Sequence, residues 1–269
     1  MQHIDISIIM PIWNGADTLD RAIHSLIDQE YFKAIPLPQV ELVMVDDYSN
    51  EQTRSKIKDW VRRLKAGITS NLHVTALRHL RNEGTSVARN TGIDASSGDV
   101  IGYLDVDDEY DPFRIVDGYL ALTKYSNADI CLSPYRLDDG SKLGEWHPER
   151  IENINGRERE FLQVSSITIP IGLMHTRKIF DKCVNKFGHG FPPGIVCGED
   201  GVLVRRMADL GAKFTYTQSL AGTYHISQFG QSRTQRRPDS GLGYAYDNQD
   251  PNGSNGQYLD KIALEAKNG

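Results

Sequence analysis

The chain has few cysteines, and they lack the spacings of a metal site. Cys131, Cys183 and Cys197 are the three cysteines among 269 residues, and they form no C-x-x-C or C-x-H pair. This pattern is neither that of a zinc site nor that of a disulfide framework. We expect three thiols in a reducing compartment.

Long apolar runs and an excess of positive charge are also missing. No segment approaches the roughly 18 consecutive apolar residues that a membrane span needs. The N-terminal "MQHIDISIIMPIW" has no basic flank and no A-x-A site, so we expect no signal peptide. The net charge of −6 disfavours general attraction to nucleic acid. We therefore expect a cytoplasmic globular protein that binds no nucleic acid.

Strand-like and helix-like segments alternate through the first part of the chain. Short apolar runs rich in β-branched residues predict buried strands at residues 5–13, 39–47, 72–79 and 99–108. Between them, apolar residues recur with the period of a helix, as at Leu19, Ala22, Ile23 and Leu26, and a further helix is expected at 85–98. Such alternation is typical of an α/β fold, with a mostly parallel central sheet and helices on both faces.

Three polar clusters follow the predicted strands. They are "PIWNG" at 11–15, "VDDYSN" at 45–50 and "DVDD" at 105–108. Ligands of such sheets bind beyond the carboxyl ends of the strands. We therefore expect the three clusters to meet in space, although they are far apart in the sequence.

The pattern is less regular beyond residue 111. It predicts a helix at 112–125, a strand at 128–137, another strand within 165–180, and a helix from 198 that leads into a short strand. From about residue 227 the chain is polar and lacks a core-forming pattern. We expect a loop there, followed by a short helix at 257–267.

The acidic stretch "GYLDVDDEYDP" (102–112) needs a partner, because carboxylates this close repel one another. On a strand, Asp105 and Asp107 would project to the same side and could share Mg²⁺ or Mn²⁺. The calcium loop of an EF-hand does not fit, since Tyr110 and Val116 stand where Gly and Glu are required. A solvated turn, with Asp111 capping the next helix, is the structural alternative.

Four segments in order resemble the family 2 glycosyltransferases of the GT-A fold. They are "SIIMPIWNGADTLDRAIHSLIDQ", "ELVMVDDYSNEQT", "RNEGTSVARNTGIDASSGDVIGYLDVDDEYDP" and "GEDGVLVRRMADLGAKFTY". The resemblance is good over about residues 5–125 and looser over 165–225. It implies transfer of a sugar from a nucleotide-diphosphate donor to an acceptor hydroxyl, with Mg²⁺ or Mn²⁺ and inversion of the anomeric centre.

The resemblance also implies a donor site. The positions that match the family's donor-binding motifs are Pro11, Ile12, Trp13, Asp46, Asp47, Asn82, Gly84, Arg89 and Asp105. Trp13 stands where the family usually has Tyr, so contact with a base is kept but the phenol is lost. Two structural alternatives stay open. Trp13 could pack in the core, and one Asp of the 46–47 pair could cap a turn or a helix. For Arg89, an ion pair with the acidic stretch is the alternative to a donor contact.

The metal and the general base follow from the same resemblance. Asp107 matches the main metal ligand of the D-x-D motif, Asp105 a ligand or ribose contact, and His225 a third ligand found in some members. Asp200 resembles the general base, and Glu199 would orient the acceptor or the donor sugar. Acids that only stabilise a helix N-terminus and a structural histidine are the alternatives.

The expected reaction is transfer of one sugar at a time. The Q-x-x-R-W motif of processive synthases is absent at "QSRT" (231–234). By family frequency we expect a UDP-sugar donor, a saccharide or glycolipid acceptor, and a role in bacterial surface polysaccharide or glycoconjugate synthesis. Arg233, Arg236 and Arg237 leave peripheral membrane contact open, beside closure over the diphosphate or a solvated tail.

Three competing functions fit these motifs less well. A nucleotidyltransferase usually has a Gly-rich basic loop after its first strand, which "PIWNGADT" is not. A glycosidase with two carboxylates would not need the nucleotide-binding pattern. A non-catalytic binder of nucleotide sugars is disfavoured because Asp107 and Asp200 are both present.

We expect one GT-A domain over 1–225, with a nucleotide-binding half at 1–110 and an acceptor half at 111–225. Residues 226–269 would form a C-terminal loop or tail with a short helix.

Overall fold

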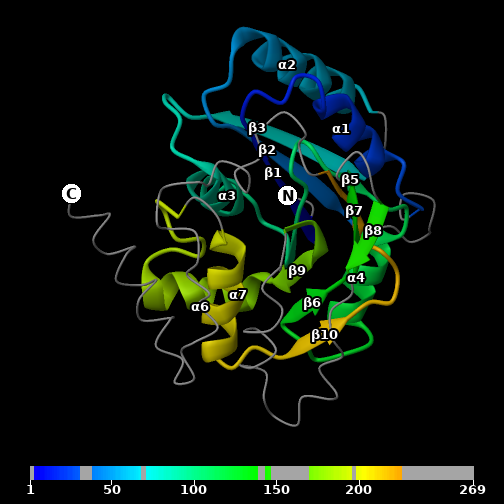
Figure 1. Ribbon diagram of the computed structural model, residues 1–269, viewed down its shortest axis with the longest axis vertical. Coiled ribbons are helices and arrows are strands. Elements are labelled where there is room, and N and C mark those ends of the chain that lie inside the picture. The colour runs from blue at the N-terminus through cyan, green and yellow to red at the C-terminus, as the bar shows by residue number, and fades with distance from the viewer. Residues whose placement is uncertain are drawn as a thin grey trace.

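A seven-stranded sheet is the centre of the computed structural model, which describes residues 3–30, 38–67, 71–138, 143–146, 170–195 and 198–225 (Figure 1). Its strands, in order across the sheet, are β10 (Phe214–Tyr216), β6 (Ile130–Leu132), β9 (Leu173–Thr176), β4 (Val100–Tyr103), β1 (Ile6–Ile12), β2 (Val40–Asp46) and β3 (Leu72–Arg78). β9 is antiparallel to β4 and β6, and the other neighbouring strands are parallel. The expected α/β class with a mostly parallel sheet is confirmed.

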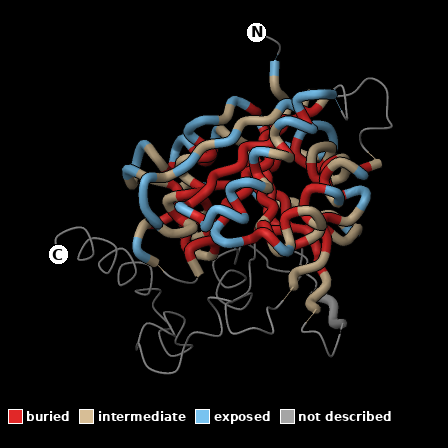
Figure 2. Tube along the Cα trace, turned by 90° about the horizontal axis from the view of Figure 1, so that it is seen from above, coloured by how far each residue is buried: buried red, intermediate tan, exposed pale blue. Residues whose placement is uncertain are grey.

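Helices cover both faces of this sheet. On one face lie α1 (Leu19–Ile27), α2 (Glu51–Lys65) and α4 (Arg114–Thr123), and on the other lie α3 (Thr85–Asp94), α6 (Arg177–Phe187) and α7 (Glu199–Asp209). The strands serve both cores by alternation, since Ile8 and Met10 of β1 belong to one core and Ile9 to the other. The buried residues therefore run through the middle of the molecule, between exposed outer helices (Figure 2).

Two glycines shape the loops that lead into helices at the carboxyl edge of the sheet. Gly84 precedes α3 with φ 89°, and Gly198 precedes α7 with φ 86°. These left-handed conformations are unfavourable for residues with a Cβ atom. Each helix consequently starts directly at this edge.

A second, four-stranded sheet lies beside the first and was not predicted. Its order is β5 (Glu109–Tyr110), β11 (Gly222–His225), β7 (Tyr135–Asp138) and β8 (Leu143–Trp146). A short 3₁₀ helix, η3 (Pro170–Gly172), precedes β9. Strands of two to four residues carry too little alternation to be recognised in the sequence.

Three predicted elements differ in extent. The strand expected at 99–108 ends at Tyr103, and the acidic residues form a turn in which the Asp108 N–H donates to the Asp105 carbonyl at 3.1 Å. The helix expected at 85–98 ends at Asp94. The strand expected at 128–137 is divided into β6 and β7 around Pro134, because proline has no N–H for a sheet ladder.

Several expectations lie outside the described residues. These are the C-terminal tail with its helix at 257–267, Arg233, Arg236, Arg237, Cys197, and most of the polar stretch between β7 and η3. The division into two halves stays a prediction. None of the described helices is both long and apolar enough to cross a membrane.

Candidate active site

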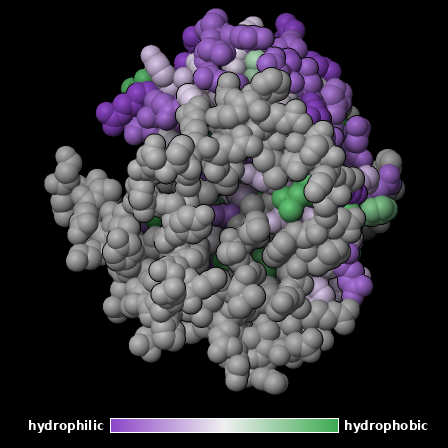
Figure 3. All heavy atoms as spheres, viewed as in Figure 1, coloured by the Kyte–Doolittle hydropathy of each residue, from purple (hydrophilic) through white to green (hydrophobic). Residues whose placement is uncertain are grey.

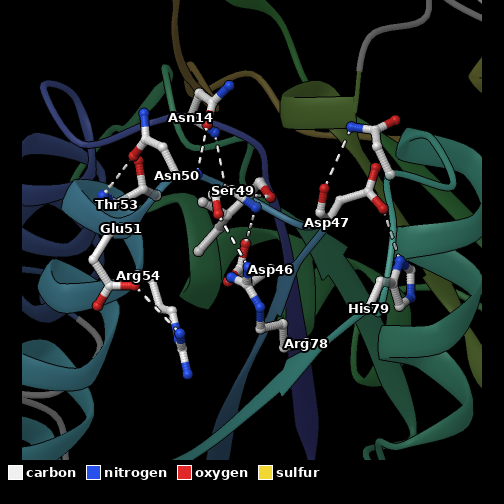
Figure 4. A network of polar contacts seen from close by, with 12 residues as sticks. Asn14, Asp46, Asp47, Ser49, Asn50, Glu51, Thr53, Arg54, Arg78 and His79 are labelled. Atoms are coloured by element: carbon white, nitrogen blue, oxygen red, sulfur yellow. Dashed lines mark hydrogen bonds and ion pairs between the residues drawn. The ribbon is translucent and has the colours of Figure 1, made fainter.

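The turns that follow β1 and β2 are hydrogen-bonded to each other. The Asn14 N–H donates to the Ser49 Oγ at 3.0 Å, and the Asn50 N–H donates to the Asn14 Oδ1 at 2.9 Å (Figure 4). Asn50 also caps α2, because its Oδ1 accepts the Thr53 N–H at 2.9 Å. Two of the predicted polar clusters therefore meet at the carboxyl edge of the sheet.

Asp46 is buried at the end of β2, where it orders the turn. Its carboxylate accepts the Ser49 N–H at 2.7 Å and forms an ion pair with Arg78. The Arg78 Nη2 also donates to the Ser49 carbonyl at 3.1 Å (Figure 4). These contacts give Asp46 a structural task in addition to any contact with a ligand.

Asp47 is also buried, and it holds the loop that leads into α3. Its carboxylate accepts the N–H groups of Glu83 and Gly84, both at 2.8 Å, and contacts the His79 Nδ1 at 2.8 Å. The Asn82 side chain donates to the Asp47 carbonyl at 3.3 Å. Asp47, Asn82 and Gly84, all predicted donor-site residues, thus form one unit.

Arg89 joins the acidic turn to the start of α7. Its buried guanidinium donates to the Glu199 Oε1 at 2.8 Å, and to both carboxylate oxygens of Asp105 at 2.9 and 2.8 Å. Burial alone lowers the pKa of Arg89, but attraction to Asp105 and Glu199 outweighs it and raises the pKa overall. Arg89 thus forms the ion pair that was its structural alternative, and a contact of Arg89 with the donor stays a prediction.

The acidic turn carries more negative charge than Arg89 neutralises. Burial and the neighbouring Asp105 raise the pKa of Asp107 to about 6. Burial, Asp107 and Asp105 raise the pKa of Asp108 well above its usual range. The Asp108 Oδ1 accepts the His225 N–H at 3.2 Å, whereas its buried Oδ2 has no hydrogen-bond partner in the described part of the chain. A buried carboxylate oxygen without a partner fits a cation.

Glu199 and Asp200 begin α7, and both are buried. Burial and the adjacent Glu199 raise the pKa of Asp200 to about 7, although Arg89 and backbone N–H groups of the helix start oppose the shift. A carboxylate with this pKa can accept a proton near neutral pH.

A family model matches the part of the chain that carries most of these motifs. The model of "Glycosyl transferase family 2" matches residues 7–184, which is more than half of the chain. The chain belongs to this glycosyltransferase family. The roles of the individual residues at the sheet edge stay predictions.

Similar proteins agree with this assignment. Over 105 residues the glycosyltransferase is 30% identical to the "Putative teichuronic acid biosynthesis glycosyltransferase TuaG" of Bacillus subtilis, covering 39% of this chain and 36% of that protein. The chain spans about a third of the length of the first curated relatives that it matches.

Solved structures show the fold. The structure of S. aureus TarS 1-349 in complex with UDP-GlcNAc superposes with a TM-score of 0.71 and 16% identity, covering 97% of this chain and 66% of the TarS 1-349 chain. The mannosyltransferase PcManGT of Pyrobaculum calidifontis, in complex with GDP-Man and Mn²⁺, gives a TM-score of 0.60 and 16% identity, covering 86% and 59%. The glycosyltransferase therefore has the GT-A fold.

The three residues predicted to contact the base at the end of β1 differ in burial. Pro11 and Ile12 of the glycosyltransferase are buried within β1, and Ile12 packs in the hydrophobic core. Trp13 follows the strand and is 40% exposed. Of these three predicted residues, Trp13 has the side-chain surface to contact a base.

The three predicted metal ligands of the glycosyltransferase are not gathered around one point. Asp105 pairs with Arg89, while the His225 ring contacts the Asp138 carboxylate at 3.0 Å and the Glu109 carboxylate at 2.8 Å. No group of three His, Cys, Asp or Glu with metal-binding geometry occurs in the described ranges. The assignment of Asp107, Asp105 and His225 as ligands thus stays a prediction.

His79 and Arg78 were not predicted to belong to the carboxyl edge of the sheet. His79 lies between the Asp47 carboxylate and the Thr91 Oγ1, which is 3.1 Å from its Nε2. The available signal was the position of both residues at the end of β3, the same place from which the predicted motifs follow β1, β2 and β4.

Proposed function

We propose that this glycosyltransferase moves a single sugar from a UDP-sugar to an acceptor hydroxyl, with the help of Mn²⁺ or Mg²⁺ and with inversion. The observation that carries the proposal is the double ion pair of Arg89 with Asp105 and Glu199. It places the predicted donor motif beside the predicted base motif, although 110 residues separate Arg89 from Glu199.

The donor would lie across the carboxyl edge of β1, β2 and β4. Trp13 offers an aromatic surface for the base. Asp47 and the loop that it holds present polar groups beside that surface. The UDP-GlcNAc complex of TarS, which shares the fold, supports a nucleotide sugar as donor.

The acidic turn fits a hard divalent cation. Asp107 and the unpartnered Oδ2 of Asp108 offer oxygen ligands, and Asp105 and His225 are the further predicted ones. When bound, Mn²⁺ or Mg²⁺ would neutralise the charge that develops on the departing diphosphate. The Mn²⁺ in the PcManGT complex supports this choice of metal.

Asp200 would act as the general base. Its pKa of about 7 allows the carboxylate to take the proton of the acceptor hydroxyl while the hydroxyl oxygen attacks the anomeric carbon. Attack opposite the departing nucleoside diphosphate inverts that carbon. Glu199, fixed by Arg89, would orient the reacting sugars.

A panel of thermal unfolding measurements tests the donor site. UDP, GDP, dTDP and CDP are each added with Mn²⁺ and with EDTA. We expect UDP to raise the melting temperature in the presence of Mn²⁺ and to have little effect in EDTA. Absence of a shift with all four nucleotides would contradict the proposed function, and a shift of equal size in EDTA would contradict the metal.

A turnover assay separates catalysis from binding. Candidate acceptors are saccharides and glycolipids of bacterial surface polysaccharide synthesis. This choice agrees with the name of TuaG, a putative teichuronic acid biosynthesis glycosyltransferase. Release of UDP that depends on one of them would identify the acceptor class.

A further inference from the structure

Exposed apolar side chains gather at the carboxyl edge of the sheet. Large exposed hydrophobic residues follow three adjacent strands in turn: Trp13 after β1 at 40% exposure, Tyr48 after β2 at 53% and Leu80 after β3 at 94%. By contrast, the surface over α2 at the top of Figure 3 is mostly hydrophilic. Single exposed apolar residues need no explanation, whereas three that follow neighbouring strands at one edge are a candidate binding surface.

The backbone at Tyr48 is unusual. Tyr48 has φ 65° and Asn14 has φ 53°, and in the described ranges these are the non-glycine residues with positive φ. Asparagine tolerates this conformation, because its short polar side chain bonds locally, whereas it is unfavourable for a bulky residue. Local preference therefore explains Asn14 and leaves Tyr48 to be explained by another role.

The turn around Tyr48 is rigid. Asp46, Asp47 and Ser49 on either side of it are buried and hydrogen-bonded (Figure 4). The Arg78 guanidinium lies 5.2 Å from the Tyr48 ring centroid, and Arg78 is itself held by Asp46 and the Ser49 carbonyl. A ring that is fixed in place before binding loses little freedom when a ligand arrives.

The turn of Tyr48 also adjoins that of Trp13. The Asn14 N–H donates to the Ser49 Oγ at 3.0 Å, so each exposed aromatic residue is the sequence neighbour of one partner in this hydrogen bond. Two exposed rings on two bonded turns offer flat apolar surfaces at the same edge, where a planar base can be stacked.

We propose that Tyr48 contacts the nucleobase of the donor and helps to select it. This inference rests on the proposed function, because it names a residue of the same donor site. It accounts for a tyrosine at a left-handed position, since ligand binding rather than folding would benefit from the ring. The Tyr48 side chain would contact the base and not the diphosphate, which the acidic turn would hold with the help of a divalent cation.

Calorimetry with four variants tests this assignment. UDP and inorganic pyrophosphate are titrated, each with Mn²⁺, into the full chain and into Tyr48→Phe, Tyr48→Ala, Tyr48→Gly and Tyr125→Ala. Tyr125 is the matched control, an exposed tyrosine after α4. Loss of a stacked base contact should weaken UDP binding roughly 5- to 150-fold in Tyr48→Ala and Tyr48→Gly. Tyr48→Phe and Tyr125→Ala should bind UDP like the unchanged chain, and pyrophosphate binding should be equal in all.

Thermal unfolding without ligand supplies the second readout. Glycine adopts φ 65° without steric strain, so Tyr48→Gly should unfold at the same or a higher temperature than the unchanged chain.

Unchanged UDP binding in Tyr48→Ala and Tyr48→Gly would overturn the inference and leave the proposed function in place. Equal weakening of UDP and pyrophosphate would also overturn it. If the unchanged chain binds UDP no more tightly than it binds pyrophosphate, both the inference and the proposed function fail.

Discussion

Asp200 should lower the stability of the folded protein at the pH where it would act. The residue is buried at the start of α7, and its pKa of about 7 lies above the ordinary value of 3.8. The folded state therefore holds the proton more tightly than the unfolded state does. As the pH rises from about 4 to about 7, the free energy of unfolding falls, because the unfolded chain gives up this proton while the folded protein still holds it.

The size of the effect follows from the shift. A rise of about three pH units, at 1.36 kcal/mol each, gives about 4 kcal/mol as an upper value above pH 7. Repulsion by the adjacent Glu199 is one cause of the shift, so we expect about 2–4 kcal/mol for Asp200 alone. Asp200→Asn keeps the size of the side chain and stays neutral. It should be more stable than the unchanged chain by this amount at about pH 8, and by about 2 kcal/mol less at about pH 5.

Urea unfolding, followed by tryptophan fluorescence in EDTA without nucleotide, gives the free energies at both pH values. Asp181→Asn on α6 is the control, because Asp181 is exposed and its replacement should change neither value by more than about 0.5 kcal/mol. The reasoning is refuted if Asp200→Asn is less stable than the unchanged chain at about pH 8, or if its gain is the same at both pH values.

Three further changes test other parts of the edge. Asp107→Ala should remove the Mn²⁺-dependent part of UDP binding in calorimetry while leaving the melting temperature in EDTA nearly unchanged or higher, because the pKa of Asp107 is raised to about 6 by burial and Asp105. Arg89→Met leaves the carboxylates of Asp105 and buried Glu199 without their partner and should cost about 3–5 kcal/mol in urea unfolding, part of which Glu199→Gln should restore in the double variant. The Tyr103 hydroxyl lies 2.6 Å from the Nε2 of buried His175, whose pKa is lowered to about 4 by burial, so Tyr103→Phe should cost about 1–3 kcal/mol with no change between pH 6 and 8. A destabilisation by Tyr103→Phe that grows steeply across this range would contradict a neutral His175.

The fold could be predicted where the strands are long and buried on both faces. The run of β1 supplies Ile8 and Met10 to one core and Ile9 to the other, which requires a nearly continuous apolar sequence. The second sheet could not be predicted, because β5, β7, β8 and β11 have two to four residues each. The ends of elements were also missed, as where β4 stops at Tyr103.

The site could be predicted as a meeting of motifs, but its contacts could not. Parallel topology placed the turns after β1 and β2 together, and the hydrogen bond between Asn14 and Ser49 confirms this. The sequence left two roles open for Arg89, since an arginine near acids can serve a donor or an ion pair. His79 was missed because a histidine at the end of a strand has no pattern that marks its partner. The three-dimensional contact with Asp47 identifies it.

The central claim is that Asp200 acts as the base beside an intact donor site. Its most direct test is to compare Asp200→Asn with the unchanged chain, both with UDP-GlcNAc and Mn²⁺. Calorimetry measures donor binding, and release of UDP measures transfer to water or to an added acceptor. We expect equal binding and a loss of release of roughly 10²–10⁴-fold in the variant. Release by Asp200→Asn within a few-fold of the unchanged chain would contradict the claim.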